Sequence, residues 1–144
     1  MGLETAIKWD RPNKIVQLSQ SALIDKITLL FGQADASPVP TPMNPRLRLQ
    51  RVTHSSLSPD EQNTLTRIPY CSLVGCSLYL TVGTRPDISY AVQQLSQFLD
   101  SYSHLHWHAT IHVVPYLKGT KDLSLNLGGN HLTLLGFIQT RPTP

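Results

Sequence analysis

Charge is scarce in this sequence, and long apolar runs are absent from it. Charged residues make up 15% of the 144-residue chain, whereas about 25% is usual for globular proteins. The net charge of +3 is compatible with a nucleic-acid partner but too small to indicate one by itself. No apolar stretch approaches the ~20 residues of a membrane-spanning helix, and no secretory signal is recognisable. We therefore expect an intracellular protein, cytoplasmic or nuclear, that is not secreted and has no membrane partner.

Cysteine is also rare, which argues against a disulfide framework or a cysteine-based metal site. Cys71 and Cys76 are the two cysteines, and on one helix their side chains would not face each other. We interpret them as buried thiols in a reducing compartment.

The residue clusters that most catalysis requires are missing as well. The sequence has no glycine-rich phosphate loop, no serine–histidine–aspartate arrangement and no group of metal-binding carboxylates. Histidines do recur at helical spacing, at His104, His108 and His112. No acid or cysteine lies beside them to complete a metal shell, so a surface of imidazole groups is favoured over a metal site. We expect no cofactor.

Three helices are predicted in the central segment 70–120. Apolar residues are so dense in 73–80 that this part should be largely buried. In 88–99 they follow a 3.6-residue period, with Pro86 suited to the first helical turn and Asp87 to the positive end of the helix dipole.

The third of these helices should run from Leu105 to Leu117 and end at Gly119. It contains Pro115, which lacks the backbone donor that a helix interior uses. We expect a bend near Ile111 rather than loss of the helix.

A β-hairpin is predicted before this region. Apolar residues alternate through 6–18 on either side of the turn 11–14. A helix capped by Ser19 or Ser21 should follow, end at Gly32 and cover the hairpin, because an isolated hairpin is marginal in water.

Two further segments do not show the helical periodicity: one has no regular pattern, and the other alternates like a strand. Residues 33–57 are rich in proline and carry Arg46, Arg48 and Arg51, which suits a solvated linker or, as the alternative, an arm that contacts phosphates. After them, Ser58 opens a helix with a capping box. Towards the end, Leu123, Leu125 and Leu127 alternate with polar residues, and a second strand is predicted at 132–135 after a tight turn.

Together these patterns predict a helix-dominant α+β fold with an N-terminal β-hairpin, four to five helices and a short C-terminal strand pair. The chain divides into four segments: 1–32 with the hairpin and first helix, 33–57 as linker, 58–120 as the helical region, and 121–144 as the strand pair with a divergent tail.

Several short motifs occur in a fixed order: Y-x-S-L-V-G from Tyr70, T-R-P-D-I-S-Y-A-V from Thr84, H-W at His106 and Y-L-K-G-T from Tyr116. In this order and spacing they resemble the Pol polyprotein of copia-type retrotransposons. The similar segment lies between the reverse transcriptase palm and ribonuclease H. The resemblance extends back to Leu18 and so covers most of the chain.

The resemblance implies a truncated fragment equivalent to the thumb and connecting region, whose role is to hold the template–primer duplex. The hairpin then corresponds to the primer grip. The partner would be an RNA–DNA hybrid or duplex nucleic acid, bound without sequence preference; the oligomeric state is left open. The candidate binding residues are Lys8, Arg11, Lys14, Arg85, Lys118 and Lys121.

The resemblance also implies that the catalytic centres lie elsewhere. The parent polymerase uses Mg²⁺ held by a palm aspartate box, which this sequence lacks, and the nuclease aspartate expected soon after Phe137 is missing. We therefore expect no enzymatic activity. Two alternatives stay open: a small non-specific nucleic-acid-binding protein, and an inert relic.

Overall fold

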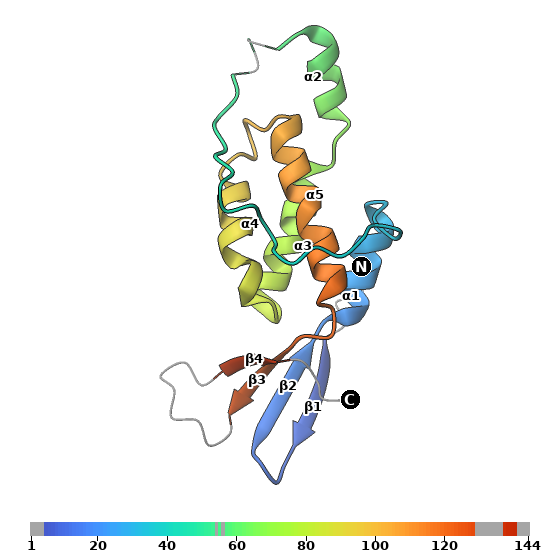
Figure 1. The fold of residues 1–144 in the computed structure, drawn as a ribbon, viewed down its shortest axis with the longest axis vertical. Helices are drawn as coiled ribbons and strands as arrows, with labels where there is room; N and C mark the ends of the chain where they lie inside the picture. Colours follow the sequence, from blue (N-terminus) through green and yellow to red (C-terminus); the bar gives the residue numbers. More distant parts are fainter. Residues whose placement is uncertain (1–4, 54, 56, 129–136, 141–144) are drawn as a thin grey trace.

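A computed structural model describes residues 5–53, 55, 57–128 and 137–140. These residues form five α-helices, one 3₁₀ helix and four strands, which confirms the helix-dominant α+β class. The helices gather in one body, and the sheet extends from one end of it (Figure 1). None of the described helices combines the length and the hydrophobicity needed to span a bilayer.

The sheet is built from both ends of the chain. Strands β1 (Ala6–Asp10) and β2 (Ile15–Ser19) form the predicted hairpin, and β3 (Ser124–Gly128) pairs antiparallel with β2. Strand β4 (Phe137–Thr140) pairs with β3 and completes the order β1-β2-β3-β4. The second C-terminal strand predicted at 132–135 lies outside the described residues. The pairing of β2 with β3 was not predicted, and it joins the first and last segments in one sheet.

Helix α1 (Ser21–Leu30) does not cover the hairpin as expected. It packs against α5 (His104–Gly119), and the hairpin is supported by β3 instead. The predicted serine caps are also wrong, because the N-cap residue of α1 is Gln20, which makes no side-chain capping bond. The Gln20 amide oxygen instead accepts a hydrogen bond from the Thr84 hydroxyl, at 2.8 Å.

Helix α5 is at the centre of the helical body. It packs against α1, α3 (Tyr70–Gly83) and α4 (Ser89–Ser96). Tyr70 anchors one end of this core: its hydroxyl donates to the Leu95 carbonyl at 2.6 Å, and its ring stacks on that of Tyr102 at 4.6 Å. Burial raises the pKa of Tyr70 to about 12, so the phenol stays protonated and keeps this bond.

Two predicted helix starts are confirmed. Helix α2 (Pro59–Thr66) has the full capping box: the Ser58 hydroxyl accepts from the Glu61 N–H, and the Glu61 carboxylate accepts from the Ser58 N–H. The 3₁₀ helix η2 (Pro86–Ile88) leads into α4, with Pro86 in its first turn.

Helix α3 is less buried than its apolar density suggested. Leu73 is fully buried, but Leu78 is 39% exposed and Tyr79 is 38% exposed. Cys71 is exposed and Cys76 is half-buried, so the prediction of two buried thiols is wrong. A segment that is apolar on every side does not reveal which side its neighbours will cover.

The predicted linker is held against the helices along much of its length, and we call residues 33–53 the strap. The Lys118 ammonium donates to the carbonyls of Ala34 and Ala36, and His112 Nε2 lies 3.1 Å from the Thr41 carbonyl oxygen. Strap side chains, among them Met43, also pack on the core. Figure 1 shows the strap in teal, crossing the helical body.

Pro115 lies inside α5 and is buried. The helix continues through it from His104 to Gly119, so the proline does not end the helix, as expected.

Candidate nucleic-acid interface

The tip of the hairpin is a tight four-residue turn. The Lys14 N–H donates to the Arg11 carbonyl at 3.2 Å, with Pro12 in the second position that such turns favour. Asp10 accepts two bonds from Asn13, one of them at 2.8 Å from the side-chain amide. These bonds fix the backbone that carries Arg11 and Lys14.

The turn is also braced by β3. Lys14 has a φ of 55°, and Gly128, which pairs with Ile15, has a φ of 91°. A Cβ atom on Gly128 would lie 2.5 Å from the Lys14 carbonyl oxygen. A glycine is therefore required where the last residue of β3 meets the tip.

An aromatic side chain and two cations come together at this tip. Trp9, Arg11 and Lys14 line one open hollow. Trp9 is 70% exposed, although it belongs to a strand. Exposed aromatic faces beside cations are typical of surfaces that bind single-stranded nucleic acid without sequence preference, and the cations can also contact the phosphates of a duplex.

Lys8 is separated from this group. Successive side chains of a strand point to opposite faces, so Lys8 lies on the other face of β1 from Ile7 and Trp9. Both Lys8 and Ile7 are exposed. The hairpin therefore presents one cation on one face and the Trp9 hollow on the other.

Arg85 does not belong to this surface, and its assignment as a phosphate contact is corrected by its burial. Its side chain is 0% exposed and binds the Asp87 carboxylate in a bidentate pair, at 3.0 and 2.8 Å. It also donates to the Thr120 carbonyl at 3.0 Å and to the Thr120 hydroxyl at 2.6 Å. A guanidinium enclosed in this way cannot reach a nucleic acid.

Tyr116 completes this group, which we call the clamp: Arg85, Asp87, Tyr116 and Thr120. The Tyr116 hydroxyl donates to Asp87 at 2.7 Å, and the Arg85 guanidinium lies over the Tyr116 ring at 5.7 Å. Burial and the Asp87 hydrogen bond raise the pKa of Tyr116. The clamp joins the start of η2 to the C-terminal end of α5, where a cation also complements the helix dipole.

Lys118 and Lys121 are engaged in contacts within the chain. Lys118 holds the strap, as described above, and Lys121 pairs with Asp25 at 3.3 Å. The Lys121–Asp25 pair is exposed on both sides, and such pairs contribute little stability. Lys121 can therefore exchange its partner, whereas Lys118 would have to release the strap.

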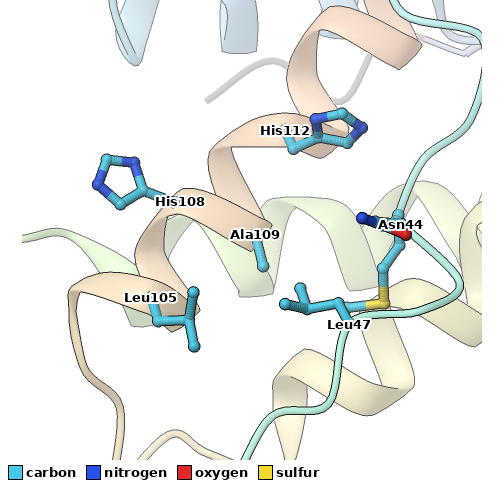
Figure 2. Close-up of a pocket in the computed structure, with 7 residues that line it drawn as sticks. Asn44, Leu47, Leu105, His108, Ala109 and His112 are labelled. Carbon is cyan, nitrogen blue, oxygen red and sulfur yellow. The ribbon is translucent and has the colours of Figure 1, made fainter.

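The histidines do not gather into a metal site. Among the residues that the structure describes, no three histidine, cysteine or acidic side chains are placed to hold a metal ion. His108 and His112 project in different directions from α5 (Figure 2), and His112 is bound to the strap. His106, between His104 and His108 in the sequence, is 1% exposed and caps α5: its Nδ1 accepts the Ser103 N–H at 3.0 Å.

Trp9 is the residue that the sequence interpretation missed. It was assigned to a hairpin strand, and alternation alone gave no reason to expect an exposed ring. The available signal was its position two residues before Arg11 on what proves to be an edge strand of the described sheet.

The chain is similar to known proteins along most of its length. The Retrovirus-related Pol polyprotein from transposon TNT 1-94 of Nicotiana tabacum is 34% identical over 128 residues, which are 89% of this chain and 10% of that polyprotein. The corresponding polyprotein from transposon RE2 of Arabidopsis thaliana is 41% identical over 129 residues, 85% of this chain and 8% of the relative. The chain is homologous to one segment of the copia-type retrotransposon Pol polyproteins.

This Pol-like segment spans a tenth or less of the length of those two polyproteins. A shorter relative is an uncharacterized mitochondrial protein of Arabidopsis thaliana, 33% identical over 103 residues, 72% of this chain and 39% of the relative. No family model matches the chain, and no solved structure matches it.

Proposed function

We propose that this Pol-like segment holds duplex nucleic acid without catalysing a reaction, and that the tip of the hairpin makes the contact. The observation that carries the proposal is the grouping of Trp9, Arg11 and Lys14 in one exposed hollow. Homology to Pol polyproteins, whose names describe retrovirus-related transposon proteins, supports a nucleic-acid partner. An RNA–DNA hybrid is the duplex that the resemblance favours.

The contact would be to the sugar–phosphate backbone. Arg11 and Lys14 supply cations, and Lys8 supplies another on the opposite face of the strand. Side chains of this kind position a nucleic acid but do not distinguish its sequence. Non-specific binding by such contacts has dissociation constants of roughly 10⁻⁴–10⁻⁶ M at physiological salt, and we expect an affinity in this range.

The binding test compares two single-charge variants. Arg11→Ala removes a cation from the tip, and Arg67→Ala removes the same side chain from the end of α2, far from the hairpin (Figure 1). Both arginines are exposed. We expect Arg11→Ala to weaken binding to an RNA–DNA hybrid at low salt and Arg67→Ala to leave it unchanged. Equal effects of the two variants would show that only net charge matters.

Trp9→Ala tests the aromatic part of the hollow. We expect weaker binding with an unchanged salt dependence, because a ring contact releases no counterions. If the pure protein does not bind the hybrid even at low salt, the inert-relic alternative is the better account.

We also propose that the segment has no polymerase or nuclease activity of its own. Two-metal catalysis of phosphoryl transfer needs clustered carboxylates, and the described residues provide no such group. We expect no primer extension and no hybrid cleavage by the purified chain with Mg²⁺. Activity that co-purifies with the protein and is abolished by a substitution in this chain would contradict the proposal.

A further inference from the structure

A second hollow lies between the strap and α4, in a part of the molecule that the hairpin does not touch. It is lined by Met43, Asn44, Pro45, Leu47, Arg48, Leu49, Tyr90 and Gln94. Its lining mixes apolar side chains with four polar ones: two amides, one phenol and one guanidinium. No carboxylate is among these lining residues.

Tyr90 is the unusual member of this hollow. It belongs to the S-Y-A-V run of α4, in which Ala91 and Val92 are each 1% exposed, whereas Tyr90 is 65% exposed. Among the described residues, neither the Tyr90 hydroxyl nor the Gln94 amide has a hydrogen-bond partner. Both groups are therefore open to a ligand.

The strap side of the hollow provides a donor and a positive charge. The Asn44 side-chain oxygen accepts the Arg46 N–H at 3.0 Å, so its amide nitrogen has two donors left for other partners. Arg48 is exposed and makes only a long contact of 3.4 Å to the Pro45 carbonyl. Asp100, the acid that pairs with a strap arginine, faces Arg51 and does not line the hollow.

We propose that this hollow binds one unpaired nucleotide of a nucleic-acid strand. The base stacks on the Tyr90 ring, its edge meets the Gln94 and Asn44 amides, and its phosphate meets Arg48. These are the side-chain types that recognise single-stranded nucleic acid. The site goes beyond the duplex contact proposed for the hairpin and shares no residue with it.

The experiment uses a short single-stranded DNA of thymidines in which one base is replaced by 5-iodouracil, which crosslinks to aromatic side chains on irradiation. We expect the crosslink at Tyr90. Tyr90→Ala should abolish it and weaken binding of the oligonucleotide by roughly 5- to 150-fold, from the usual strength of stacking on one base. Tyr90→Phe should retain the binding, because the ring remains.

The matched control is Tyr79→Ala, which removes a tyrosine that is 38% exposed on α3, outside the hollow. It should bind as the wild type does. Circular dichroism and the denaturant midpoint of Tyr90→Ala should match those of Tyr79→Ala, which shows that both variants are folded. Gln94→Ala and Arg48→Ala should weaken binding of the oligonucleotide by a smaller factor, and they test the hollow without changing the tyrosine.

The outcomes separate this proposal from the hairpin contact. The variant Lys8→Ala/Arg11→Ala/Lys14→Ala should still crosslink at Tyr90. A crosslink at Trp9 instead, wild-type binding by Tyr90→Ala, or no binding of the single strand at low salt would overturn the hollow as a nucleotide site. Each of these results can be obtained whether or not the hairpin binds the hybrid.

Discussion

The helical body and the hairpin use the same kinds of side chain in opposite ways. In the body, Arg85 is fully buried and binds Asp87 and Thr120 of its own chain. On the hairpin, Arg11 and Lys14 lie in solvent beside a tryptophan that is 70% exposed. A basic residue in the sequence therefore says nothing about binding until its burial is known.

The contrast also explains what the shared motifs do. In Y-L-K-G-T, Tyr116 and Thr120 belong to the clamp, Leu117 is in the core and Lys118 holds the strap. A Cβ atom on Gly119 would lie 2.7 Å from Pro38 of the strap. The residues of this family motif thus mainly stabilise the packing of the helical body.

The largest expected effect comes from breaking the clamp. Arg85→Leu should lower the free energy of unfolding by about 3–5 kcal/mol, because it removes the cation that neutralises the partly buried Asp87 carboxylate. Arg85→Lys should also destabilise, since an ammonium cannot replace the bidentate pair. Urea unfolding measures both. A midpoint close to that of the wild type in the leucine variant would show that the clamp is not structural.

Restoring a backbone donor in α5 should have the next largest effect, with the opposite sign. Pro115→Ala is expected to stabilise the protein by about 1–3 kcal/mol, less than the full penalty of an interior proline because some buried contact is lost. Alanine is a suitable replacement, since Pro115 is buried and a charged side chain there would be buried without a partner. An unchanged or lower urea midpoint would mean that the proline suits the native helix.

Acid should weaken the start of α5 through His106. Burial lowers the pKa of His106, opposed only in part by the Gln50 backbone, so the folded state favours the neutral ring. This contribution to stability is complete above the ordinary histidine pKa of about 6.5 and is lost as the pH falls below it. Protonation would also remove the Nδ1 acceptor for the Ser103 N–H. Loss of a helix cap typically lowers the free energy of unfolding by about 0.5–2 kcal/mol.

The control for this prediction is His106→Gln, because glutamine can act in a capping box without titrating. Denaturant midpoints measured between pH 8 and pH 5 should fall for the wild type and fall less for the variant. Parallel curves would assign the acid sensitivity to other groups.

Two glycines should respond to alanine with opposite signs and sharpen the comparison between body and hairpin. Gly75 lies in α3, and a Cβ atom added to it would have no neighbouring atom within 4 Å, so Gly75→Ala should stabilise by about 0.5–1 kcal/mol. Gly128→Ala should instead destabilise by about 1–3 kcal/mol, because of its positive φ and its contact with Lys14. Thermal unfolding distinguishes the signs, and stabilisation by Gly128→Ala would contradict the close packing of β3 on the tip.

Much of the secondary structure could be predicted because local signals specify it. The capping box at Ser58, the hairpin turn and the glycine after α1, which has a φ of 69°, each depend on a few adjacent residues. The pairing of β2 with β3 could not be predicted, since it joins segments from opposite ends of the chain. The apolar alternation of a strand shows that it is a strand but does not show which strand it pairs with.

The faces of helices were predicted less well for the same reason. Leu99 and Leu105 belonged to predicted apolar stripes, yet they are 42% and 52% exposed. Leu99 lies just beyond the end of α4, and Leu105 lies in the first turn of α5. Among the candidate binding residues, sequence reasoning could recognise charge but not the partner. Asp87 is two residues from Arg85, and Thr120 is brought to it only by the fold.

The salt dependence of binding tests the central claim most directly. If Lys8, Arg11 and Lys14 each neutralise one phosphate of an RNA–DNA hybrid, log K should fall with log[salt] at a slope of about −3, from about −0.9 per phosphate. The variant Lys8→Ala/Arg11→Ala/Lys14→Ala should bind all sequences more weakly and give a much flatter slope. Identical slopes for the variant and the wild type would remove the hairpin from the interface and contradict the account.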